Sequence, residues 1–313
     1  MVFVNNFVYA ADKNYNKQLF YSIYSLLDNS NTHIDLHIIH KEPDTFSEYK
    51  NYIEKKFYNF SITLYPFQFK NINFPNLENK HVSEATYYRL FIDKIIPQNI
   101  EYYIYLDADI IAINNFDSYL DRATLKLIES DYVVACRTDF NKDTMNEEYF
   151  KNLEMFSSKY FNAGVMIVDN KKWIDQKIGD MVLERLEEIK DKINYWDQDV
   201  LNSYIDGKYI ELNEEFNYPI DLASPTSHKK IKKNALLIHY QGNNKPWNIR
   251  GCFNISASFY QNIALITEGK YHLVKTVRRF DLIYLIKKTI NLEFKNLSKK
   301  LNFYKESIKI IFF

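Results

Sequence analysis

Cysteine is almost absent from this chain, which has only two among its 313 residues, Cys136 and Cys252. Two cysteines cannot form the disulfide framework of a small secreted domain, and they fit a reducing compartment. No apolar run reaches the ~18 residues needed to span a membrane. The N-terminal sequence MVFVNNFVYAAD lacks the basic and hydrophobic regions of a signal peptide. These absences predict a cytoplasmic location.

Net charge is absent as well, because 40 Lys and Arg residues balance 40 Asp and Glu residues. The chain as a whole therefore lacks the positive potential on which nucleic-acid binding depends, and we expect no nucleic-acid partner. The charges are nevertheless unevenly distributed. Residues 270–313 contain eleven basic and three acidic side chains, a net charge of +8, which leaves −8 on residues 1–269.

Glycine and proline are scarce, with six and seven residues. The sequence contains no glycine-rich phosphate loop and no clear nucleophile motif, which argues against a nucleotidyltransferase or a phosphatase. Aromatic residues are abundant instead, with 26 Tyr and 23 Phe. An AT-rich genome produces the same bias, so the aromatic content gives no functional indication.

The local patterns predict an α/β fold. Short apolar runs rich in β-branched and aromatic residues alternate with helical patterns, which favours a mostly parallel sheet with helices on both faces. We expect strands at 7–10, 34–40, 61–65, 102–106, 132–135, 164–168 and 236–240. We expect helices near 15–28, 44–57, 84–94, 171–190 and 197–205, and loops at 207–234. Ligands in such sheets bind beyond the carboxyl ends of the strands.

The pattern changes near residue 271, so we divide the chain into residues 1–270 and a basic helical tail, residues 271–313. Apolar and basic positions of the tail recur at helical spacing; they are Leu273, Val277, Phe280, Ile283, Tyr284, Ile286, Lys287 and Ile290. Basic amphipathic helices of this kind can lie on an anionic membrane surface. The alternative is a solvated helix packed on the main domain. The first interpretation predicts a peripheral protein on the inner face of the cell membrane.

Two aspartates, Asp107 and Asp109, follow the apolar run at 102–106. One residue separates them, so in an extended strand both carboxylates point to the same side. Two like charges need a cation between them, and with no lysine cluster nearby we expect a divalent ion. Carboxylates suit Mg²⁺ or Mn²⁺, either of which neutralises the charge of a departing diphosphate. The alternative is a pair of aspartates that caps a turn.

A second polar segment, LLIHYQGNNKPW, follows the strand expected at 236–240. The imidazole of His239 can complete a mixed oxygen and nitrogen metal site and favours Mn²⁺ somewhat over Mg²⁺. Gly242 allows the backbone to approach a phosphate, and Lys245 offers a positive charge to it. The alternatives are a half-buried histidine with satisfied hydrogen bonds and a packing turn at 245–247.

Six segments in order resemble family eight of the glycosyltransferases, which includes glycogenin and the bacterial lipopolysaccharide α-galactosyl- and α-glucosyltransferases. They are FVYAADKNY, HVSEATYYRL, YIYLDADII, YFNAGVMIVDNKKW, YWDQDVLN and IHYQGNNKPW. The resemblance implies a GT-A type, Rossmann-like catalytic domain over residues 1–270 that retains the α configuration of the sugar. It implies a UDP-hexose donor, with galactose or glucose, and a glycan or glycolipid acceptor in lipopolysaccharide or other surface polysaccharide synthesis.

The resemblance also assigns roles to individual residues. Those expected to contact the donor are Ala10, Asp12, Asn14, Arg89, Asp107, Asn162, Ala163, Asp197, Gln198, Gly242 and Lys245. The expected metal ligands are Asp107, Asp109 and His239, with Mn²⁺ as the ion and Mg²⁺ as the alternative.

Asp197 and Gln198 match the positions beside the reactive carbon of the donor sugar and are the expected catalytic residues. Because an amide is a poor nucleophile, Gln198 favours a route in which leaving group and acceptor occupy the same face. Asp139 matches an acidic position near the substrate, whereas Asp199 is expected to cap the following helix. For Asp12 the alternative role is likewise helix capping. The alternative functions are a nucleotide-sugar-binding protein without turnover and a self-glucosylating, glycogenin-like protein.

Overall fold

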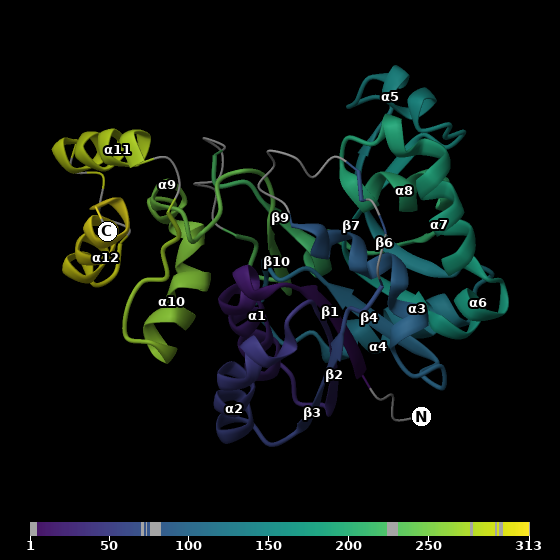
Figure 1. Ribbon diagram of the computed structural model, residues 1–313, viewed down its shortest axis with the longest axis horizontal. Coiled ribbons are helices and arrows are strands. Elements are labelled where there is room, and N and C mark those ends of the chain that lie inside the picture. The colour runs from purple at the N-terminus through teal and green to yellow at the C-terminus, as the bar shows by residue number, and fades with distance from the viewer. Residues whose placement is uncertain are drawn as a thin grey trace.

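The computed structural model describes residues 5–69, 72, 74, 75, 83–223, 231–275, 278–291, 293 and 297–312. Its centre is a seven-stranded sheet with the order β3–β2–β1–β4–β7–β6–β8 (Figure 1). Neighbouring strands are parallel except that β7 runs antiparallel to both β4 and β6, so the expected mostly parallel sheet is confirmed. The strands are β1 (Asn5–Ala11), β2 (Ile34–His40), β3 (Phe60–Pro66), β4 (Tyr102–Leu106), β6 (Val134–Asn141), β7 (Lys159–Asp169) and β8 (Ile210–Glu211).

A second, three-stranded sheet lies beside the first. It contains β5 (Ile110–Ala112), β10 (Leu237–Tyr240) and β9 (Tyr218–Ile220), in the order β5–β10–β9. The strand expected at 236–240 therefore lies outside the main sheet. It pairs instead with β5, which continues the chain directly after the turn that ends β4.

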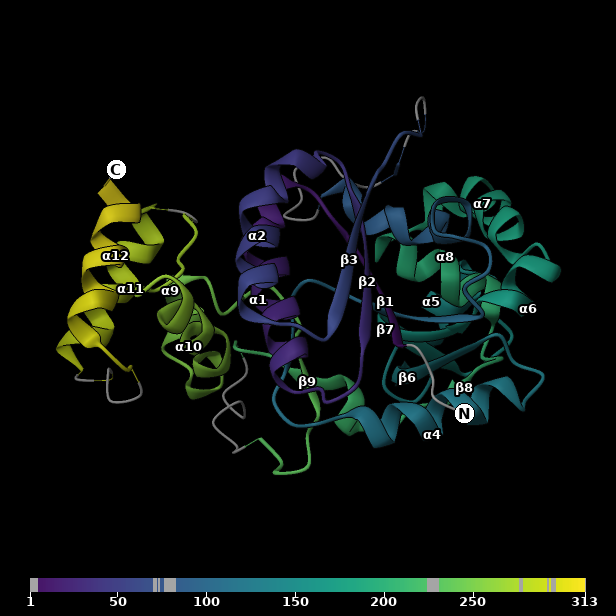
Figure 2. The ribbon, with the colours of Figure 1, turned by 90° about the horizontal axis from the view of Figure 1, so that it is seen from below.

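Helices cover both faces of the main sheet (Figure 2). One face carries α1 (Asn16–Asp28), α2 (Ser47–Lys56) and α4 (Asp117–Ile128). The other face carries the 3-10 helix η3 (Glu84–Phe91), α3 (Ile92–Ile95), α5 (Glu147–Asn152), α6 (Asn170–Asp175), α7 (Ile178–Ile189) and α8 (Trp196–Ile205). Because side chains alternate along a strand, Phe7 and Tyr9 of β1 enter the first core and Val8 enters the second.

Several expected elements differ in detail. The helix expected at 171–190 is two helices, because Lys177 adopts a left-handed conformation between α6 and α7. The helix expected at 84–94 is a 3-10 helix up to Phe91. The tract 207–234, expected to be loops, contains β8 and β9, and its residues 224–230 lie outside the described residues.

The basic tail packs against the end of the main domain. Helices α11 (Arg278–Ile290) and α12 (Lys300–Phe312) share an apolar cluster with α9 (Ile249–Cys252) and α10 (Ser258–Thr267), and lie beyond α10 from the sheet (Figures 1 and 2). Val277, one of the apolar positions of the expected pattern, lies outside the described residues. No helix in the described ranges is long and apolar enough to cross a membrane.

Candidate active site

A cavity of about 550 Å³ lies at the carboxyl ends of β1 and β4, between the main sheet and β10. The start of β7 also reaches it, because an antiparallel strand begins where its parallel neighbours end. The expected site residues that line it are Ala10, Arg89, Asp107, Asp109, Asp139, Asn162, Asp197, Gln198, His239, Gly242 and Lys245. Asp12, Asn14 and Ala163 do not line it. Asp12 accepts a hydrogen bond from the Asn14 backbone N–H (2.8 Å) and so caps a short helix.

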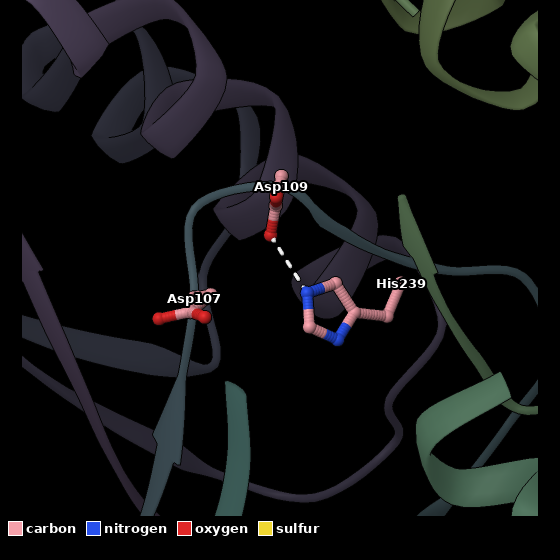
Figure 3. Close-up of side chains that lie close together, drawn as sticks. All are labelled: Asp107, Asp109 and His239. Atoms are coloured by element: carbon pink, nitrogen blue, oxygen red, sulfur yellow. Dashed lines mark ion pairs between the residues drawn. The ribbon is translucent and has the colours of Figure 1, made fainter. Parts of the chain in front are cut away.

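Asp107 and Asp109 converge on this cavity from a turn, not from an extended strand. The Ile110 backbone N–H donates to the Asp107 carbonyl over 3.2 Å, which closes the turn between β4 and β5. The expectation that the two carboxylates face the same side is confirmed, although the reason given for it was wrong. Ligand atoms of Asp107, Asp109 and His239 all lie within 4.8 Å of one another (Figure 3).

The pairing of β10 with β5 explains how His239 reaches the aspartates. The register places His239 opposite Ile110, the residue that follows Asp109. Gly164 of β7 provides the room, since a Cβ there would lie 2.4 Å from His239 Cε1 and 2.8 Å from Asp107 Oδ2. Glycine is therefore required at this position by the close approach of the Asp107 carboxylate and the His239 imidazole.

Each carboxylate also has a cationic neighbour. Arg89 Nη2 lies 2.9 Å from Asp107 Oδ1, and Lys245 Nζ lies 2.8 Å from Asp109 Oδ2. The expectation that no cation other than a metal ion would be available was therefore wrong. Both cations come from distant parts of the chain, from η3 and from the segment after β10. They were expected to contact the donor, but their contacts with the two aspartates were not expected.

Arg89 is held in a buried network. Its Nε lies 2.6 Å from Asp197 Oδ2, its Nη1 donates to the Ala163 carbonyl over 2.6 Å, and its guanidinium lies 4.5 Å from the centroid of the Tyr105 ring. Thr86 Oγ donates to Asp197 Oδ1 over 2.7 Å. Asp197 therefore orients Arg89, which in turn contacts Asp107.

Burial and charge shift two carboxyl groups in opposite directions. Burial raises the pKa of Asp197 to about 6, and Arg89 opposes this rise. Burial also favours a raised pKa at Asp109, but the neighbouring Lys245 ammonium outweighs it and holds that pKa well below its usual range. Asp109 is therefore an anion at neutral pH, whereas Asp197 takes up a proton in mildly acidic solution.

Gln198 and Asp199, neighbours in α8, both have hydrogen-bond partners. Gln198 Oε1 accepts from the Ala163 backbone N–H (2.9 Å), and its Nε2 donates to Tyr160 Oη (3.3 Å). Asp199 accepts from the backbone N–H groups of Asn194 (2.7 Å) and Tyr195 (2.8 Å). Asp199 thus holds the start of its own helix, while Gln198 lines the cavity and fixes the backbone of β7.

Sequence reasoning missed a buried side chain that contacts His239. Asn217 is the last residue of η5 (Glu214–Asn217), directly before β9. It is fully buried, and its Oδ1 lies 3.1 Å from His239 Nδ1. Its Nδ2 donates to Asn162 Oδ1 over 3.0 Å. It lies in the tract of weak periodicity, and a lone asparagine gives no signal of its own.

A family comparison decides the class of protein. Residues 6–250 match the model of glycosyl transferase family 8. This chain belongs to that family. The expected resemblance is confirmed, and the carboxylate and histidine cluster is therefore the candidate active site of a glycosyltransferase.

Named relatives agree with this assignment, and a solved structure agrees in its fold. The chain is 30% identical over 259 residues to the lipopolysaccharide 1,2-glucosyltransferase of Escherichia coli K12, covering 78% of this chain and 72% of that relative. It is 25% identical over 307 residues to the lipopolysaccharide 1,3-galactosyltransferase of Salmonella typhimurium, covering 96% and 89%. The crystal structure of the galactosyltransferase LgtC with donor and acceptor sugar analogues superposes with a TM-score of 0.67 at 24% identity, over 88% of this chain and 99% of that chain. This last likeness concerns the fold.

Proposed function

We propose that this glycosyltransferase transfers galactose or glucose from a UDP-sugar to a glycan acceptor in lipopolysaccharide or other surface polysaccharide synthesis, with retention of the α configuration. The observation that carries the proposal is the convergence of Asp107, Asp109 and His239 on a cavity that also contains Arg89 and Lys245. Anionic, imidazole and cationic groups of this kind suit a metal-bound diphosphate. The names of the relatives support a hexose donor and a lipopolysaccharide acceptor.

The three clustered side chains fit a divalent ion, which we propose is Mn²⁺, with Mg²⁺ as the alternative. Asp109 Oδ1 is buried and makes no hydrogen bond with any described residue, although His239 Nε2 lies only 3.3 Å away. A mixed set of carboxylate and imidazole donors suits Mn²⁺ better than Mg²⁺. A bound ion would neutralise charge on the departing diphosphate. Asp107, Asp109 and His239 would hold it.

Arg89 and Lys245 supply fixed positive charge at the same site. Arg89 is buried, and burial opposes its charge, but Asp107 and Asp197 raise its pKa so that it stays a cation. Lys245 Nζ is anchored by Asp109 and by the Tyr240 carbonyl, 2.5 Å away. Pre-positioned donors aimed at developing charge are worth about 10²–10³ in turnover each.

We propose that retention proceeds on one face of the sugar. The bond from the anomeric carbon to the diphosphate oxygen breaks and the bond to the acceptor oxygen forms on the same side. The acceptor's proton moves to a diphosphate oxygen. Gln198 supports this route because its carbonyl oxygen is already bound by the Ala163 N–H, so it positions the sugar pocket and does not attack. Replacement of Gln198 by Ala should lower turnover sharply, and near-full turnover would exclude that positioning role.

Release of UDP without an acceptor tests the donor assignment. Purified protein with Mn²⁺ is incubated with UDP-galactose, UDP-glucose, UDP-N-acetylglucosamine or GDP-mannose, and free nucleotide is measured. We expect UDP release from one of the two UDP-hexoses, and loss of it in Asp109→Asn. Asp191→Asn, at an exposed aspartate, is the matched control. Absence of release from all four donors would reject the proposal, and hexose added to the protein itself in its intact mass would favour self-glucosylation.

We also propose that the tail attaches the cytoplasmic enzyme to the inner face of the cell membrane. Phe280, Ile283 and Ile290 share one face of α11 and are 55%, 54% and 74% exposed, while the opposite face packs in the apolar cluster. Arg279 and Lys287 are exposed beside them. Apolar residues flanked by cations favour an anionic lipid surface.

Vesicle flotation tests the attachment. Ile283→Ser combined with Ile290→Ser should reduce binding to vesicles containing phosphatidylglycerol, with no change for phosphatidylcholine alone. Phe156, which is 92% exposed in the main domain, provides the control variant Phe156→Ser. Unchanged flotation of the α11 variant would reject attachment through this helix.

A further inference from the structure

A chain of buried hydrogen bonds connects the backbone of β7 to the imidazole of His239. The Gly164 N–H donates to Asn162 Oδ1 over 3.0 Å, and Asn217 Nδ2 lies 3.0 Å from the same oxygen. Asn217 Oδ1 in turn lies 3.1 Å from His239 Nδ1. The residues Asn162, Asn217 and His239 are only 6%, 0% and 5% exposed, so their polar groups satisfy one another inside the protein.

The direction of every bond in this chain follows from its first member. A backbone N–H can only donate, so the Asn162 atom that faces Gly164 is the carbonyl oxygen. The opposite end of that amide agrees, since Nδ2 lies 3.4 Å from an Asp139 carboxylate oxygen. An amide oxygen can only accept, so Asn217 presents Nδ2 to Asn162 and Oδ1 to His239. The Nδ1 atom of His239 must then carry a hydrogen.

We propose that Asn217 is a positioning residue that fixes His239 in its Nδ1–H form, so that Nε2 presents a lone pair toward Asp109. The alternative tautomer places a lone pair of Nδ1 against the Asn217 oxygen. Rotating both amides to avoid this clash would leave the buried Gly164 N–H facing an NH₂ group. Metal-ligating histidines commonly have their second nitrogen fixed by such a partner. The step from tautomer to metal affinity rests on the proposed function, whereas the tautomer itself does not.

Nitrogen-15 NMR reads the tautomer directly. The chain has seven histidines, so histidine-selective labelling and a long-range ¹H–¹⁵N correlation spectrum are tractable, with His239→Gln assigning the resonance. In metal-free wild-type protein we expect the hydrogen on Nδ1 of His239. In Asn217→Leu we expect it on Nε2, because the acceptor at Nδ1 is gone and Asp109 Oδ1 lies 3.3 Å from Nε2. A wild-type ring protonated on Nε2 alone would overturn the proposal.

Metal affinity provides the second readout. Titration with Mn²⁺ alone should show a Kd about 10–100-fold weaker for Asn217→Leu, the usual effect of losing such a partner. Asn217→Asp keeps an acceptor for Nδ1–H and should keep the wild-type tautomer, so it tests the proposal if the leucine variant does not fold. An Asn217→Asp protein protonated on Nε2 alone would overturn it.

A matched control distinguishes loss of the Asn217–His239 contact from the general effect of losing a buried amide. Asn170 is also fully buried and donates to the Ile100 carbonyl (2.8 Å) at the far end of β7. Asn170→Leu should lower stability and leave both the His239 tautomer and the Mn²⁺ affinity unchanged. Asn217→Leu with a wild-type tautomer and affinity would overturn the proposal. Absence of Mn²⁺ binding by the wild-type protein would instead reject the metal site. The NMR spectrum would still show whether Asn217 fixes the His239 tautomer.

Discussion

Replacement of Gly164 by alanine adds a single methyl group at a position where the site has no room for it. The added Cβ would lie 2.4 Å from Cε1 and 3.0 Å from Nδ1 of His239, and 2.8 Å from Oδ2 of Asp107. Carbon atoms in contact are separated by about 3.5–4.0 Å, so the imidazole must move by about 1 Å. Metal sites tolerate deviations of only about 0.2 Å in ligand distance. Both displaced groups are proposed ligands, so the ion should lose two of its three protein partners together.

The expected result is a Kd for Mn²⁺ weakened by about 10–100-fold or more. The fold itself should survive, because Gly164 is not at positive φ and overpacking of a core costs about 1–3 kcal/mol. Isothermal titration with Mn²⁺ measures the affinity, and urea unfolding measures the stability.

Gly269→Ala is the matched control. Gly269 has a φ of 71°, and a Cβ there would meet no atom within 4 Å. Alanine at this position should cost about 1–2 kcal/mol of stability through its left-handed backbone while leaving Mn²⁺ affinity unchanged. A folded Gly164→Ala protein that binds Mn²⁺ as tightly as wild-type protein would contradict this prediction.

Three further predictions follow from the buried charges. Arg89→Met should lower the free energy of unfolding by about 3–5 kcal/mol in a urea titration, because Asp107 and Asp197 lose their buried partner; a loss within error of zero would contradict this pairing. UDP release should fall as the pH drops below about 6, because Asp197 becomes protonated there and releases Arg89. The rate of Asp197→Asn should not show this fall at acidic pH. A variant that still shows it would mean that another group causes the fall. Burial lowers the pKa of His272 to about 3, so the free energy of unfolding should decrease as the pH falls from 6.5 toward 3, by at most about 1.4 kcal/mol per pH unit. His272→Gln should flatten this dependence in urea titrations at several pH values. Identical profiles of the variant and the wild-type protein would refute the prediction.

The main sheet could be predicted because its strands are covered on both faces. The run 102–106 is continuously apolar, which is typical of a buried strand. Helix α4 was not expected. Its buried residues Leu120, Ala123 and Leu127 recur at helical spacing and pack on the sheet, so this helix could have been predicted from its periodicity.

The sequence predicted many of the residues of the candidate site, but it did not predict how they are arranged. Asp107, Asp109 and His239 stand in segments that resemble a known family, and the structure brings them together. The pairing of β10 with β5 and the hydrogen bond between Asn217 and His239 depend on how distant segments pack together, which no local sequence pattern encodes. The same holds for Arg89, whose two carboxylate partners are distant in sequence.

The most direct test of the proposed metal site is whether turnover depends on a divalent ion held by Asp109. Wild-type protein is stripped with a chelator and assayed for UDP release from its UDP-hexose before and after Mn²⁺ is restored. Activity should disappear on chelation and return with Mn²⁺ in the wild-type protein, and it should not return in folded Asp109→Asn. Full turnover in the chelator, or an Asp109→Asn enzyme as active as wild type, would contradict it.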